Sequence, residues 1–99
     1  MKTFSKEEVT RYLELNLEGW TLGDTGIKRE FKFANFVQAF SFMTSVALEA
    51  EKINHHPDWS NSYNRVSIVL MTHSAGGITE NDLNLANSVE SAYKKCHSS

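Results

Sequence analysis

Two segments of this chain, 20–33 and 59–73, alternate apolar and polar residues with a period of two, and residues of helical period precede, separate and follow them. In the first segment, Gly-Asp-Thr-Gly at 23–26 is typical of a tight turn and predicts a β-hairpin. In the second, we expect strands at 59–63 and 65–73. The element order is therefore α-β-β-α-β-β-α, and its simplest packing is an α+β fold with a four-stranded antiparallel sheet and helices on one face.

Capping signals mark the first and last helices. Ser5 and Glu8 have the spacing of a capping box, which predicts that a helix begins there. Thr79 is a suitable N-cap for a helix that runs toward the C-terminus. The expected inner stripe of that last helix is Leu85, Val89, Ala92 and Cys96.

The middle helix is predicted at 36–53, with Asn35 as its N-cap and an end near His55, because Pro57 disfavours helical geometry in the residue before it. Its apolar residues form two stripes: Phe36, Phe40, Met43, Ala47 and Ala50 on one, and Phe42, Val46 and Ile53 on the other. Both stripes could be buried within one monomer, but that is hard to achieve in a small domain. We therefore expect a homo-oligomer, with Val46 facing outward.

Size and composition restrict the class of protein. Ninety-nine residues suit one domain, which we expect to span 1–99. A net charge of −2 gives no electrostatic reason to bind nucleic acid or an anionic membrane. The single cysteine excludes an internal disulfide, and the polar N-terminus does not resemble a signal peptide. We expect a cytoplasmic protein, small enough to enter the nucleus by diffusion.

Three of the four histidines lie at the edges of predicted elements: His55 and His56 at a helix end, and His73 at a strand end before a glycine-rich loop. Histidine is the side chain best suited to exchange protons near neutral pH. The alternative for any one of them is a surface ring or a packed ring with one hydrogen bond.

Three carboxylates could support these histidines. Glu51 lies in the last turn of the middle helix, where the helix dipole disfavours an anion, and it is one turn before His55. Asp82 follows Thr79 with capping spacing, and Asp58 follows the proline. Their alternative roles are a solvated surface charge, a helix cap and a turn, respectively.

Two other chemistries receive less support from the sequence. The histidines lack the spacing of H-x-x-x-H or H-E-x-x-H metal motifs, so we expect no metal and no cofactor. The alternative is a three-histidine metal site assembled from separate elements, for which the sequence offers no specific support. Nucleophilic catalysis is less favoured still, because Cys96 lies on a helix's inner stripe and there is no serine-centred elbow.

These residues resemble the signature of the pterin-4a-carbinolamine dehydratases. The signature has a charged residue or histidine, three positions, a histidine, a histidine or asparagine, and a small residue or proline. Five or six positions, an aromatic residue, nine positions, a histidine or tryptophan and a downstream aspartate follow. This chain matches it at Glu51, His55, His56, Pro57, Tyr63, His73 and Asp82. Residues 42–86 are similar to the core of the family almost throughout.

The resemblance implies an enzyme that dehydrates 4a-hydroxytetrahydropterin to the quinonoid dihydropterin, and so recycles the cofactor of aromatic amino acid hydroxylases. It also implies the α-β-β-α-β-β-α fold, no metal, and a dimer or tetramer. The animal member of the family is also a dimerisation cofactor for a homeodomain transcription factor. A second hypothesis for this chain is therefore a protein-binding coactivator that docks through helix 36–53.

The resemblance also suggests a role for each site residue. We expect His56 and His73 to be the acid–base pair, and His55 to orient the substrate hydroxyl or share the acid role. Glu51 would hold a histidine tautomer, and Asp82 would lie behind His73. Substrate contacts are expected from Trp20, Trp59, Asp58, Thr72 and Ser74, the two tryptophans by stacking on the flat pterin.

Overall fold

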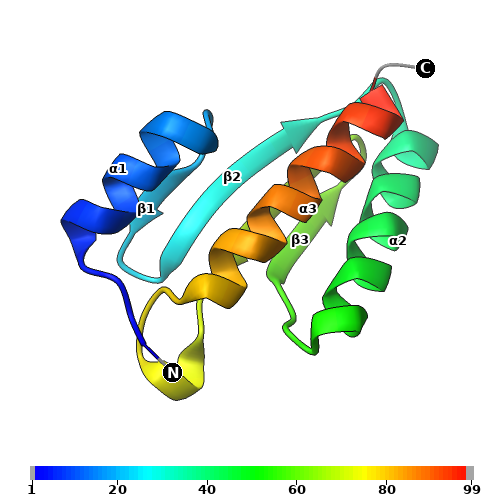
Figure 1. Ribbon diagram of the computed structural model, residues 1–99. Helices are drawn as coiled ribbons and strands as arrows, with labels where there is room; N and C mark the ends of the chain where they lie inside the picture. The colour runs from blue at the N-terminus through cyan, green and yellow to red at the C-terminus, as the bar shows by residue number, and fades with distance from the viewer. Residues whose placement is uncertain (1, 98–99) are drawn as a thin grey trace.

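The computed structural model describes residues 2–97 and confirms the predicted order of elements (Figure 1). The elements are α1 (Lys6–Asn16), β1 (Thr21–Gly23), β2 (Gly26–Lys32), α2 (Phe36–Ile53), β3 (Asp58–Ser62), β4 (Arg65–Leu70), the short 3₁₀ turn η1 (His73–Ala75) and α3 (Glu80–His97). The capping box of α1 is present, and the hydrogen bond from the Ser5 backbone N–H lowers the pKa of the Glu8 carboxyl.

The four strands form one antiparallel sheet in the order β1-β2-β4-β3. Helices α2 and α3 run side by side over one face of this sheet, and α1 packs beside β1 (Figure 1). The opposite face carries exposed polar side chains, including Lys28, Glu30 and Ser60. The predicted α+β fold with helices on one face is therefore confirmed.

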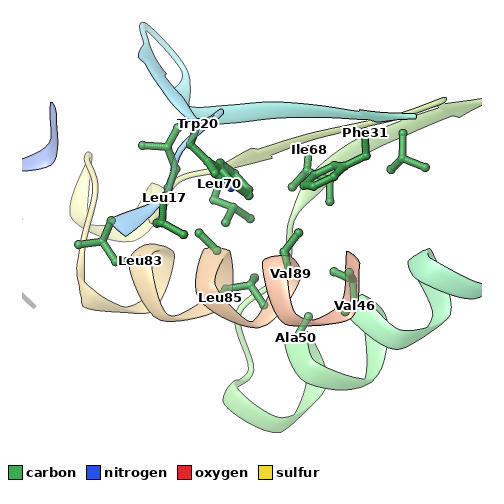
Figure 2. Close-up of a cluster of buried hydrophobic side chains, with 14 of the residues drawn as sticks. Leu17, Trp20, Phe31, Val46, Ala50, Ile68, Leu70, Leu83, Leu85 and Val89 are labelled. Atoms are coloured by element: carbon green, nitrogen blue, oxygen red, sulfur yellow. The ribbon is translucent and has the colours of Figure 1, made fainter. Parts of the chain in front are cut away.

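The core fills the space between the sheet and the helices (Figure 2). Phe31 of β2 lies at its centre, with its ring centroid 4.9 Å from that of Phe42 and 4.9 Å from that of Tyr93. Ile68 and Leu70 of β4 are fully buried on the same face. Burial of these side chains fixes which face of the sheet meets the helices.

Helix α2 has two apolar faces, as the sequence predicts, but the prediction that Val46 faces outward is wrong. Val46 is fully buried, and it packs in the core with Ala39, Phe42 and Ala50. The outward residues are instead Phe36, Val37, Phe40 and Leu48, which are 47%, 71%, 57% and 62% exposed. They recur at helical spacing, and we call these four residues the α2 surface.

The end of α2 determines where the histidine pair begins. Asn54 adopts a left-handed conformation with φ of 51°, which asparagine tolerates better than most residues. The His55 backbone N–H then donates to the Ala50 carbonyl oxygen at 3.0 Å, which closes the helix. Two residues later Pro57 directs the chain into β3.

Strand β4 is shorter than predicted. It ends at Leu70, so His73 does not end a strand but begins η1. The chain turns there because Thr72 forms an isolated bridge with Gly77 and closes a small loop. None of the helices in residues 2–97 is long and apolar enough to cross a membrane.

Candidate active site

The chain segments 55–58 and 72–73 come together at one end of the sheet, where α2 ends, β3 begins and α3 begins. Two side-chain links connect them. His73 at the start of η1 contacts Asp58 at the start of β3, and Thr72 is joined to His55 through Asp82. The three histidines of the predicted site therefore belong to one region of the molecule.

His55 is the most buried of the three histidines. Its side chain is 11% exposed, and its Nε2 lies 2.6 Å from Oδ1 of Asp82, which is fully buried. The other carboxylate oxygen, Oδ2, accepts hydrogen bonds from the Thr72 hydroxyl at 2.8 Å and the Thr79 backbone N–H at 2.9 Å. Asp82 thus caps α3 and holds His55 at the same time, as its spacing from Thr79 allows.

His56 pairs with Glu51 on the exposed side of the site. The distance from His56 Nε2 to Glu51 Oε1 is 2.7 Å, and the two side chains are 56% and 76% exposed. The sequence predicts that Glu51 pairs with His55 one helical turn later, but the helix ends at Ile53 before that turn is complete. Glu51 does hold a histidine, and that histidine is the next one along the chain.

His73 pairs with Asp58 at the third position. The distance from His73 Nε2 to Asp58 Oδ2 is 3.1 Å, and both side chains are largely exposed. The sequence predicts Asp82 behind His73, whereas in the structure Asp82 contacts His55. Asp58, for which substrate contact stays a prediction, is the carboxylate that His73 contacts.

The residues expected to bind substrate fall into different environments. Ser74 is exposed in η1, whereas Trp59 near the start of β3 is half-buried and packs against the core. Thr72 is 7% exposed and engaged by other side chains. Trp20 is 4% exposed, lies among the core side chains in Figure 2, and donates its indole N–H to Glu90 at 2.8 Å. Its burial removes the ring face that stacking requires.

One residue that hydrogen-bonds with Thr72 and Asp82 was not predicted from the sequence as part of the site. Thr79 was expected only to begin α3, but its hydroxyl lies 2.7 Å from the hydroxyl of Thr72. The only signal in the sequence was its spacing from Asp82, which helix capping explains fully. Within residues 2–97 no group of three or more His, Cys, Asp or Glu side chains has an arrangement that could hold a metal ion.

All three histidines present Nε2 to a carboxylate. A carboxylate that accepts a hydrogen bond from one ring nitrogen fixes the orientation of the imidazole. The other nitrogen, Nδ1, is then the atom that can exchange a proton with a ligand. The fold and this set of pairs define a small α+β protein with three histidine–carboxylate pairs at one end of its sheet.

Comparison with known proteins identifies the family to which this chain is similar. The family model described as "Pterin 4 alpha carbinolamine dehydratase" matches residues 2–92. Relatives from Rhizobium leguminosarum bv. trifolii and Prochlorococcus marinus (strain NATL2A), each named "Putative pterin-4-alpha-carbinolamine dehydratase", are 52% and 51% identical. The first alignment covers 93% of this chain and 94% of the relative, and the second covers 86% and 88%.

A solved structure that is similar to this chain is also described as a pterin dehydratase. A protein from Brucella melitensis, described as a transcriptional coactivator/pterin dehydratase, is 41% identical with a TM-score of 0.88. The match covers 93% of this chain and 99% of that one. The chain belongs to the pterin-4a-carbinolamine dehydratase family, and the resemblance found in its sequence is confirmed.

Proposed function

We propose that this protein dehydrates 4a-hydroxytetrahydropterin to the quinonoid dihydropterin and water by histidine acid–base catalysis. The reaction would recycle the tetrahydropterin cofactor of aromatic amino acid hydroxylases. The observation that carries the proposal is the set of three imidazole–carboxylate pairs at one end of the sheet. Membership of the dehydratase family supplies the substrate class.

The chemistry requires one proton to be given and one to be taken. The C4a–O bond breaks as an acid protonates the leaving hydroxyl, and water departs. A base removes the proton of a ring nitrogen, whose electron pair forms the new C=N bond. Two histidines can perform both transfers without a metal, and each transfer typically contributes a factor of ~10² to 10⁴.

We assign the acid–base pair to His56 and His73, the two rings that are more than half exposed. Glu51 and Asp58 orient them. His55 is 11% exposed and fixed by Asp82, which suits a group that binds and orients the substrate hydroxyl rather than one that moves. Trp59 and Ser74 lie at the same end of the sheet and complete the substrate contacts.

Dehydration by metal-free protein tests this function. The protein is treated with EDTA, dialysed, and mixed with freshly generated 4a-hydroxytetrahydropterin, and formation of the quinonoid product is followed by stopped-flow absorbance. The expected result is a rate well above the uncatalysed one and unchanged by EDTA. Activity that EDTA removes and zinc restores would reject metal-free catalysis, and no acceleration at all would reject the function.

The α2 surface supports a homo-oligomer. Its residues are large, apolar and 47–71% exposed, and the rings of Phe36 and Phe40 already pack against each other with centroids 5.8 Å apart. Leu48 also lines a groove of about 700 Å³ between α2 and α3. A second copy of this chain, packing the same helix against itself, would remove this surface from water.

A second candidate function is that of a protein-binding coactivator. It is favoured by the same α2 surface and by the Brucella melitensis protein, which is described as a transcriptional coactivator as well as a pterin dehydratase. An apolar helix face of this kind suits docking against another helix. The α2 surface and the histidine site have no residue in common, so the two functions are compatible, and a variant of Phe40 would separate them.

A further inference from the structure

Three polar side chains are buried in the part of the chain that the structure describes. They are Thr72, Thr79 and Asp82, which are 7%, 0% and 0% exposed. All three belong to one hydrogen-bonded network, which ends at His55. Burying a hydroxyl or a carboxylate is costly unless every group is paired, so this network is an unusual use of a small core.

The direction of each hydrogen bond follows from the donors available. The Thr72 hydroxyl donates to Asp82 Oδ2 at 2.8 Å, which uses its only hydrogen. The Thr72 and Thr79 hydroxyl oxygens are 2.7 Å apart, so the hydrogen between them must come from Thr79. The chain of donation therefore runs from Thr79 to Thr72 to Asp82.

The same reasoning fixes the tautomer of His55. Oδ2 of Asp82 is occupied by two donors, the Thr72 hydroxyl and the Thr79 backbone N–H. Oδ1 lies 2.6 Å from His55 Nε2, and a carboxylate can only accept, so Nε2 carries the hydrogen. In the neutral ring, Nδ1 of His55 is then a free acceptor aimed away from Asp82.

We infer that Thr72 and Thr79 are positioning residues that hold His55 as its Nε2–H tautomer through Asp82. Only the expected change in turnover rests on the proposed function; the tautomer of His55 does not. Thr72 was expected from the sequence to contact substrate, but its burial and its two hydrogen bonds assign it to the support of His55 instead. Thr79 is included because its hydroxyl donates to the Thr72 hydroxyl oxygen, so the single Thr72 hydrogen is donated to Asp82.

The test removes each hydroxyl without changing the shape of the side chain. Thr72→Val and Thr79→Val are compared with Thr72→Ser and Thr79→Ser, which keep the hydroxyl. Thr10→Val, on the exposed face of α1, is the matched control. In each protein the tautomer of His55 is read from the long-range ¹⁵N–¹H correlations of its ring, assigned with His55→Gln.

The expected result is the Nε2–H tautomer of His55 in the wild type, the serine variants and the control. In Thr72→Val the Asp82 carboxylate loses one of the two donors that hold Oδ2, so Oδ1 can turn away from Nε2, and we expect a mixture of tautomers. Turnover should fall about fivefold in Thr72→Val, the factor that corresponds to one net hydrogen bond, and less in Thr79→Val. The pH profile of turnover should shift in the valine variants and remain unchanged in the serine variants.

An Nδ1–H tautomer of His55 in the wild type would overturn the inference, whether or not any variant folds. Valine variants that keep both the wild-type tautomer and the wild-type pH profile would also overturn it. The tautomer measurement requires no substrate. If the wild-type protein fails to dehydrate the pterin but shows Nε2–H at His55, the proposed function is wrong and the positioning network stands.

Discussion

His55 and Asp82 are 27 residues apart in the sequence, and their side chains meet with 2.6 Å between Nε2 and Oδ1. This contact joins the end of α2 to the first turn of α3. Because Asp82 is fully buried and also caps α3, the pair belongs both to the fold and to the site. The other two histidine–carboxylate pairs are exposed and have no such structural role.

The first prediction follows from this difference. His55→Ala leaves the buried Asp82 carboxylate without one of its donors, so the free energy of unfolding should fall by about 1–3 kcal/mol. His56→Ala removes an exposed contact and should lower it by less than about 0.5 kcal/mol. Urea denaturation measures both. Equal effects on stability would show that the His55–Asp82 pair is not the structural one.

The two tryptophans should respond in opposite ways. Trp20→Phe loses the hydrogen bond to the part-buried Glu90, so we expect a loss of about 1–3 kcal/mol in stability and an unchanged KM. Trp59→Ala removes a half-buried ring two residues after Pro57, so KM should rise about two- to tenfold if the ring stacks on the pterin. A raised KM in Trp20→Phe with normal stability would reverse these assignments.

The third prediction concerns assembly. Phe40→Glu places a charge on the α2 surface, so the protein should dissociate to a monomer of 11.2 kDa while it keeps its helical content. Val46→Glu buries the charge in the core and should unfold the chain. Light scattering and circular dichroism distinguish the two variants. A wild-type mass of 11.2 kDa at micromolar concentration would contradict the proposed homo-oligomer.

The sequence predicts the fold well because its signals are local. Asn35 and Pro57 bracket α2, and the bounds 36–53 are confirmed. The two-sided character of α2 is also confirmed, but periodicity does not show which stripe meets the sheet, and the prediction that Val46 faces outward is therefore wrong. That choice depends on how the elements pack, which no short window of sequence contains.

The sequence does not predict which carboxylate each histidine contacts. Each of the three histidines has a carboxylate, but two pairings differ from those expected. The left-handed turn at Asn54 ends the helical register, so Glu51 reaches His56 instead of His55. Strand β4 ends at Leu70, three residues early, and the chain then brings His73 to Asp58. Tertiary geometry decides both partners.

The most direct test of the histidine site is the stopped-flow turnover of His56→Ala, His73→Ala and the double variant with 4a-hydroxytetrahydropterin. Each single change should lower kcat by about 10²-fold or more with little loss of stability, because both rings are exposed. The double variant should lose less than the product of the two, since residues that act as one unit are non-additive. Wild-type turnover in both single variants would contradict the assignment of these histidines as the acid–base pair.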